Sequence, residues 1–236
     1  MMLKVWKECR GLLGRSGEEV VFMNSRIRKL SRSVLATLAV ASSVVLGIPS
    51  ASAQSTYFWS GNASTAGGNG TWDTTLTNWS ATGANGTFTL QWSNASNDTA
   101  VFGSTAGTVT LGTPITAGGL TFNTTGYVVT GSTLTLAGAS APIISVSAGT
   151  STISSDIAGT NGLEKTGGST TLILSGTNNT YSGTTTISAG ILQGNKSTPA
   201  GASPFGTSTI QLNAGTQLNS ITISANDTPE TYIFGN

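Results

Sequence analysis

Ionisable and nucleophilic side chains set narrow limits on the chemistry of this chain. It contains no histidine among its 236 residues, and its single cysteine is Cys9. The lack of histidine excludes imidazole acid-base catalysis, Ser-His-Asp and Cys-His arrangements, and zinc sites built on imidazole. Beyond residue 53 there is no arginine, and the charged residues are scattered: Asp73, Asp98, Asp156, Glu164, Lys165, Lys196, Asp227 and Glu230. We predict no catalytic residue, no cofactor and no metal site, although two carboxylates from different segments could still meet as a glycosidase pair.

The charge balance of residues 54–236 also limits the kinds of partner. Two lysines against six acidic residues give this part a formal charge of −4. A nucleic-acid-binding surface needs clustered lysine and arginine, which are lacking here. We therefore expect no nucleic acid among the partners. This part also holds no cysteine, so its stability must come from its core and hydrogen bonds and not from disulfides.

Apolar residues alternate with threonine, serine and asparagine along most of the chain after residue 98. Low-complexity polar sequences often remain disordered, but disorder does not require regular alternation. The alternation instead predicts short β-strands. The expected strands are Ala100–Phe102, Thr108–Leu111, Leu120–Asn123, Tyr127–Thr130, Thr133–Ala137, Ile143–Ser147, Thr150–Ser154, Thr171–Ser175, Thr184–Ser188, Gly190–Gln193, Ser208–Asn213 and Gln217–Ser224.

Two all-β architectures compete for this pattern, a β-sandwich and a right-handed parallel β-solenoid. A sandwich would need bulky residues on both inner faces, and large aromatic residues are sparse after Phe102. A solenoid core is narrow and is filled by stacked Leu, Ile and Val, while Thr, Ser and Asn form ladders outside. We therefore predict a right-handed parallel β-solenoid, or β-helix, over residues 99–236, with coils of about 20 to 25 residues.

The segment 54–98 differs because it holds four tryptophans: Trp59, Trp72, Trp79 and Trp92. The first coil of a solenoid would expose apolar side chains and unpaired strand edges if nothing covered it. We predict that this Trp-rich segment is an N-terminal cap. The functional alternative is a glycan-contacting platform built from the same four residues, because exposed tryptophan faces stack on sugar rings.

Residues 1–53 have the pattern of an export leader. Basic residues from Arg26 onward precede an apolar stretch that ends in Ala51-Ser52-Ala53. These are the parts of a helical secretory signal peptide, with cleavage expected after Ala53. The apolar stretch is shorter than the roughly 20 residues that a membrane-spanning helix needs. Met23 is a better start than Met1, since the segment before it has no apolar period.

A run from Gly162 to Gln193 reads GLEKTGGSTTLILSGTNNTYSGTTTISAGILQ. It has a Lys-x-Gly, a strand ending Leu-x-Leu-x-Gly, an Asn-Thr-Tyr-x-Gly turn and a closing Gly-x-Leu. The residues in these places are Leu163, Lys165, Gly167, Leu172, Leu174, Gly176, Asn179, Thr180, Tyr181, Gly183, Ile187, Gly190 and Leu192. In this order and spacing the run resembles the autotransporter-associated β-strand repeat of bacterial passenger domains.

This resemblance implies an exported passenger with a structural or adhesive role, at the bacterial cell surface or secreted. It implies that the repeat aids passage of the passenger across the outer membrane, and that the partner is a translocator β-barrel. The chain stops at Asn236 without room for such a barrel, so we expect either a truncated reading frame or secretion without its own pore. Lys165 is expected to make a surface contact along a ladder.

Two other functions remain as alternatives. The first is a carbohydrate-binding module that uses the Trp-rich segment, with a host or environmental glycan or a surface receptor as its partner. The second is a solenoid polysaccharide lyase or hydrolase, which would depend on carboxylates such as Asp156 or Asp227.

Overall fold

The computed structural model describes residues 54–195, 203–220 and 232–234, which lie in one compact unit. All regular structure in these residues is β-strand, which confirms the all-β prediction. No helix of sufficient length and hydropathy to span a membrane occurs among them. The predicted leader, its cleavage residues Ala51 and Ala53, and the predicted strand beyond Ser220 lie outside the described residues.

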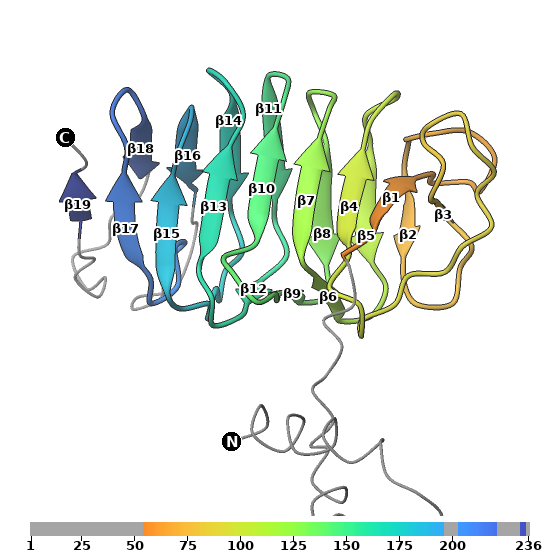
Figure 1. Ribbon diagram of the computed structural model, residues 1–236, viewed down its shortest axis with the longest axis horizontal. Coiled ribbons are helices and arrows are strands. Elements are labelled where there is room, and N and C mark those ends of the chain that lie inside the picture. Colours follow the sequence, from red (N-terminus) through yellow and green to blue (C-terminus); the bar gives the residue numbers. More distant parts are fainter. Residues whose placement is uncertain (1–53, 196–202, 221–231, 235–236) are drawn as a thin grey trace, which may run out of the picture. The chain divides into compact units, whose positions relative to one another are not determined.

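The described strands form three sheets, two of which are long (Figure 1). The first sheet contains, in order, β19 (Tyr232–Phe234), β17 (Thr209–Leu212), β15 (Thr184–Ile187), β13 (Leu163–Thr166), β10 (Ile143–Val146), β7 (Gly119–Phe122), β4 (Thr99–Phe102), β1 (Thr56–Trp59) and β3 (Trp79–Ser80). The second contains β18 (Gln217–Ser220), β16 (Ile191–Gly194), β14 (Thr171–Leu174), β11 (Thr150–Ile153), β8 (Val128–Gly131), β5 (Thr108–Leu111) and β2 (Gly70–Trp72). The third is short, with β12 (Ile157–Ala158), β9 (Leu134–Leu136) and β6 (Ile115–Ala117).

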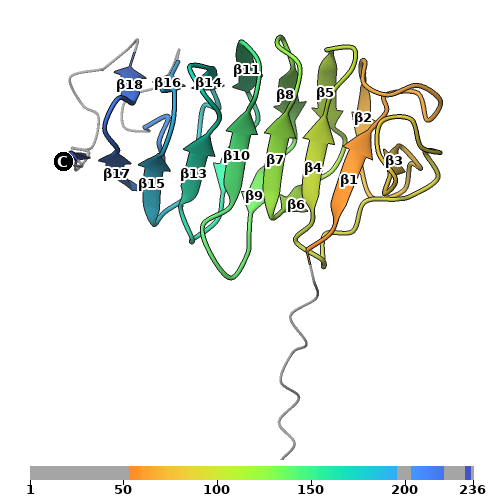
Figure 2. The ribbon, with the colours of Figure 1, turned by 45° about the horizontal axis from the view of Figure 1, so that its top comes forward.

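Except for the antiparallel pair of β1 and β3, the strands of each sheet are parallel, because the chain returns to each sheet one coil later (Figure 2). In the first sheet Thr99 pairs with Gly119, and Gly119 pairs with Ile143. The same return links Thr184 to Thr209 further along. These intervals agree with the predicted coils of about 20 to 25 residues, and the fold is a parallel β-solenoid as predicted.

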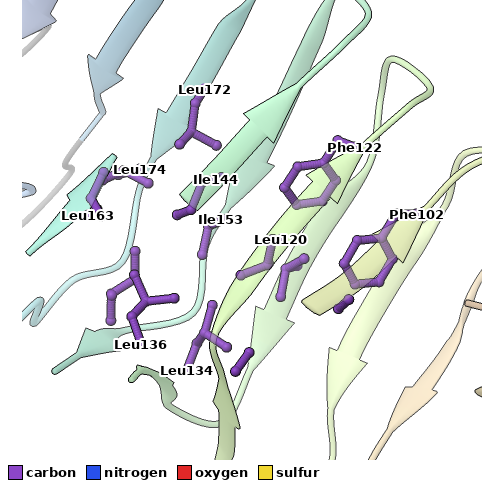
Figure 3. Close-up of a cluster of buried hydrophobic side chains, with 14 of the residues drawn as sticks. Phe102, Leu120, Phe122, Leu134, Leu136, Ile144, Ile153, Leu163, Leu172 and Leu174 are labelled. Atoms are coloured by element: carbon purple, nitrogen blue, oxygen red, sulfur yellow. The ribbon is translucent and has the colours of Figure 1, made fainter. Parts of the chain in front are cut away.

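The core lies between the sheets and consists of side chains from alternate strand positions. In β5 and β14 every second residue is buried. Phe102 and Phe122 stack in neighbouring coils with ring centroids 5.1 Å apart. Figure 3 shows Leu120, Ile144 and Leu163 among the buried side chains of successive coils. Each coil thus buries its apolar side chains against the coil before and the coil after it.

The Trp-rich segment is continuous with the solenoid. Its strands β1 and β2 pair in parallel with β4 and β5. Strand β3 then pairs antiparallel with β1, with Trp59 opposite Trp79, and ends the first sheet. Residues 54–98 therefore supply the first rungs of two sheets together with the antiparallel strand beyond them.

Candidate functional site

The residues that the sequence pattern singled out between 163 and 193, here called the repeat segment, mostly point into the solenoid. Its apolar members are fully buried: Leu163, Leu172, Leu174, Ile187 and Leu192. Leu172 pairs with Ser151 in the coil before and with Leu192 in the coil after. Each apolar position of the repeat thus contributes to an inward column that runs through neighbouring coils.

The glycines of the repeat segment lie where backbones of two coils approach closely. Gly167 has φ +90°, and a Cβ there would lie 1.9 Å from Val146 O of the preceding coil. Gly190 has φ +74°, and its Cβ would meet Gly168 O and Thr170 O at 2.5 Å. Only glycine combines this backbone conformation with so little space. Gly176 and Gly183 are similarly crowded by backbone atoms of the neighbouring coil.

Lys165 is buried with an exposed fraction of 0%, so the predicted surface contact is wrong. Its place in β13 is an inward core position, paired with Ile144 on one side and Ile187 on the other. The long side chain passes along the apolar interior, and its ammonium reaches oxygen atoms at the turn. Alternation along the strand places Lys165 on the same face as Leu163, and from this signal the sequence could have predicted that Lys165 is buried.

The Lys165 ammonium links its own coil to the next one. Nζ donates to Thr166 O at 3.0 Å and Gly167 O at 3.3 Å, and also to Ala189 O at 3.1 Å in the following coil. It lies 3.4 Å from Thr170 Oγ1, which in turn donates to Val146 O of the preceding coil at 2.6 Å. One polar network inside the solenoid thus spans three consecutive coils.

Burial lowers the pKa of Lys165 from its ordinary 10.5 to about 8. The unfolded chain therefore holds this proton more tightly than the folded chain between about pH 8 and 10.5. Because stability rises with pH wherever the unfolded state binds more protons, we expect the free energy of unfolding to rise across this window and to be level below it. Urea denaturation from pH 7 to 10 measures this dependence.

Lys165→Met is the matched variant, since methionine keeps an unbranched side chain without the titrating group. We expect the free energy of unfolding of the wild type, relative to Lys165→Met, to increase between pH 8 and 10. Parallel pH profiles for the two proteins would contradict the assignment of this titration to Lys165.

Asn179 forms the second polar link between coils. Its side chain is 5% exposed, and its Oδ1 accepts a hydrogen bond from Ile157 N–H of the preceding coil at 2.7 Å. Its Nδ2 donates to Pro204 O of the following coil at 2.7 Å. The Asn-Thr-Tyr turn therefore presents an amide that satisfies one backbone donor and one backbone acceptor in two different coils.

Thr180 and Tyr181 complete the same turn. The Thr180 side chain is exposed, and its backbone N–H donates to Ile157 O at 2.8 Å. Tyr181 is buried, and its hydroxyl lies 3.2 Å from Thr185 Oγ1. Thr185 Oγ1 also lies 2.8 Å from Ser208 Oγ of the following coil. The aromatic ring is thus part of the core, while its hydroxyl joins a buried chain of hydroxyl groups.

Asn179→Ala is expected to lower the free energy of unfolding by about 3 kcal/mol, because it leaves Ile157 N–H and Pro204 C=O buried without their partner. Asn178→Ala is the control, since that neighbouring side chain is exposed and its backbone N–H, which donates to Asp156 Oδ1, is retained. Urea denaturation followed by circular dichroism compares the two. Equal losses in both variants would refute the bridging role of Asn179.

The four tryptophans of the Trp-rich segment are buried together, with exposed fractions of 0 to 2%. Ring centroids of Trp72 lie 5.0 Å from Trp79 and 4.7 Å from Trp92. Trp59 and Phe102 join the cluster at 5.1 Å from Trp79 and 5.7 Å from Trp72 respectively. Stacking on a sugar requires an exposed ring face, so these rings do not form a glycan platform in this structure.

Side chains of the Trp-rich segment also form hydrogen bonds with backbone groups at β2 and β6, the edge strands of the second and third sheets. Asn78 Nδ2 donates to Thr71 O on β2 at 3.0 Å. At β6, Asn94 Nδ2 donates to Pro114 O at 3.0 Å, and Asn94 Oδ1 accepts from Thr116 N–H at 2.9 Å. Trp92 Nε1 donates to Thr116 O at 2.9 Å. These contacts replace a neighbouring strand and leave fewer edge groups free for another chain.

The carboxylates within the described residues are bound to neighbouring hydrogen-bond donors. Asp73 Oδ1 accepts from Thr75 N–H and Leu76 N–H, which holds the pKa of Asp73 below its ordinary value although desolvation opposes this. Asp156 accepts from Asn178 N–H, and Glu164 accepts from Ser188 Oγ. No group of three or more potential metal-ligating side chains occurs among these residues.

Comparisons with known proteins agree with this geometry. Residues 163–193 match the model of the Passenger-associated-transport-repeat family. The chain is 45% identical over 187 residues to the Adhesin BmaC autotransporter of Brucella suis biovar 1 (strain 1330). That similarity covers 78% of this chain but 5% of the Brucella protein. No solved structure matches the chain.

These observations agree with one another. The Lys-x-Gly, Asn-Thr-Tyr and glycine positions of the matched repeat are the positions that join one coil to its two neighbours. The repeat, the parallel solenoid and the similarity to an autotransporter adhesin together fit a segment of an autotransporter passenger.

Proposed function

We propose that this chain is part of an autotransporter passenger that is displayed at the bacterial cell surface, where it has a non-catalytic, adhesive role. The similarity to an autotransporter adhesin carries this proposal, and the repeat match within residues 163–193 supports it. The described part of the chain adds a stack of coils whose outer positions are mostly threonine, serine and asparagine. Repeated coils offer an extended surface for attachment.

The proposal divides the chain into three parts. Residues 1–53 act as the leader, residues 54–98 cap the solenoid, and residues 99–236 form the passenger solenoid. The coverage of the β2 and β6 edges by Asn78 and Asn94 supports the cap. A translocator barrel in the outer membrane is the partner that this arrangement requires.

Adhesion can be tested by displaying residues 54–236 on a laboratory Gram-negative bacterium through a fused translocator barrel. Attachment to cultured epithelial cells is compared with that of bacteria displaying the barrel alone. We expect the solenoid to increase attachment, and display is verified by antibody labelling. Equal attachment by both strains at equal display would contradict an adhesive role for this segment on that surface.

The proposal also gives the repeat segment a role in outer-membrane passage, because its polar networks bind each new coil to its neighbours. Deleting residues 163–184 removes one coil and joins Gly162 to Thr185, which takes the register place of Leu163. Deleting residues 119–142 is the control, since Ile143 pairs with Gly119 and replaces it in register. We expect the first deletion to reduce surface display more than the second. Equal display would refute a specific role of the repeat.

A further inference from the structure

Asp98 is a buried carboxylate at the start of β4. Its side chain is 2% exposed, and its Oδ1 accepts a hydrogen bond from Ser55 N–H at 2.8 Å. Burying a carboxylate costs free energy unless a cation or several donors compensate. Among the described residues its side chain accepts this one hydrogen bond and has no cationic partner.

The described groups around Asp98 carry no positive charge. Gln54 Nε2 donates to Asn97 O at 2.8 Å, Gly118 N–H donates to Asp98 O at 2.9 Å, and Thr99 N–H donates to Ser55 O at 2.8 Å. The cationic side chain within the described residues, Lys165, bonds to carbonyl oxygens at 166, 167 and 189. Residues 54 and 55 form hydrogen bonds with Asn97 and Asp98, directly beside this carboxylate.

We propose that Asp98 is the counter-ion of the α-ammonium group that leader removal creates at Gln54. This inference rests on the cleavage expected after Ala53. The nitrogen atoms of successive residues are separated by at most about 3.7 Å, which places the new terminus within about 6.5 Å of Asp98 Oδ1. A free terminus rotates about its last bonds, so its ammonium can approach the carboxylate while Ser55 N–H keeps its hydrogen bond.

Removal of the leader then stabilises the first coil by creating this ion pair. Before cleavage, the nitrogen of Gln54 is a neutral amide and Asp98 has no cationic partner there. After cleavage, an ion pair ties the entry of β1 to the start of β4, and Gln54 Nε2 holds the same entry through Asn97 O. Gly118 permits the close approach of these segments, since a Cβ there would lie 1.9 Å from Asn97 O.

The test uses the full chain, exported by a Gram-negative host with its own leader. Mass spectrometry identifies the mature terminus, and the pKa of its amine is measured by NMR after reductive methylation with ¹³C-formaldehyde. We expect a free amine on Gln54 with a pKa at least about one unit above the roughly 8 of a peptide amine. In Asp98→Asn the amine should titrate near 8.

A second variant keeps Asp98 intact and covers the case in which Asp98→Asn does not fold. One alanine inserted between Ala53 and Gln54 moves the ammonium one residue away. A raised pKa of the amine in the folded state gives stability that is present below about pH 8 and lost as pH passes through the folded value. We expect the thermal midpoint of the wild type, relative to this variant, to fall between pH 7 and 10.

Three results would overturn the proposal. The first is a wild-type amine that titrates like a free peptide amine. The second is an identical pH dependence in the wild type and the alanine-insertion variant. The third is a mature chain that starts elsewhere, or in which the α-nitrogen of Gln54 has attacked its own Cδ with loss of ammonia, because neither leaves an ammonium at Gln54.

Discussion

Replacing Trp72 by alanine is expected to lower the free energy of unfolding by about 3 to 5 kcal/mol, the usual cost of removing a buried tryptophan. The Trp72 ring is fully buried between Trp79 and Trp92 and contacts Phe102 of the next coil. Its Nε1 has no hydrogen-bond partner, so the loss comes from packing alone. The four tryptophans of residues 54–236 all lie before residue 99, and fluorescence therefore reports on this end of the solenoid.

Urea denaturation monitored by fluorescence and by circular dichroism separates local from global effects. In a stack where each coil contacts its neighbours, we expect the fluorescence midpoint to fall further than the dichroism midpoint. Leu76→Ala is the control, because Leu76 lies in the same segment with 42% of its surface exposed. If Trp72→Ala unfolds at the same urea concentration as Leu76→Ala, the tryptophan cluster does not stabilise the first coil.

Gly167→Ala is expected to cost about 3 kcal/mol or more. A Cβ at this position would lie 1.9 Å from Val146 O and 2.7 Å from Val146 C, which are backbone atoms and cannot move without disturbing the preceding coil. The φ of +90° adds conformational strain for any residue with a Cβ. The turn also carries Gly167 O, an acceptor of the Lys165 ammonium, so the same substitution disturbs the buried network.

Gly168→Ala gives the matched comparison one residue away. A Cβ on Gly168 would have no atom within 4 Å, and the residue is exposed. We expect Gly168→Ala to change the free energy of unfolding by less than about 0.5 kcal/mol, as for ordinary surface substitutions. Thermal denaturation of both variants measures the difference. Similar midpoints for Gly167→Ala and Gly168→Ala would show that close coil packing at Val146 does not limit this position.

Alternation of apolar and hydroxyl residues predicted most strands of the two long sheets, but not β1, β2, β3, β13 or β19. The register Val109 to Val129 and Leu172 to Leu192 follows from apolar columns that repeat once per coil. The spaced motif likewise predicted the repeat segment, which the family comparison confirms over residues 163–193. These features were predictable because each depends on local periodicity or on glycine positions.

The sequence did not predict β13, and of the third sheet it predicted β9 but not β6 or β12. Strands β6 and β12 are short, with two or three residues each, and so give no clear alternation. In β13 the inward position of Lys165 was not predicted, because it follows the charged Glu164 and lysine side chains usually lie at the protein surface. Its burial depends on oxygen atoms from the turn at 166–167 and from Ala189, which come together only when the coils stack.

The roles of Asn179 and of the tryptophans depend on tertiary structure in the same way. The partners of Asn179, Ile157 and Pro204, lie in two other coils, and the sequence alone does not place them beside it. The sequence left the four tryptophans open between a cap and a sugar-binding surface. Burial of all four rings removes the second role, because that role requires exposed ring faces.

Surface display is the central claim and can be measured directly in the bacterium from which this chain comes. Antibodies raised against residues 54–236 are applied to intact cells and to permeabilised cells, with an antibody against a periplasmic protein as the control for intact membranes. The account predicts strong labelling of intact cells. Labelling that appears only after permeabilisation would contradict it, because a passenger retained inside the outer membrane cannot mediate attachment.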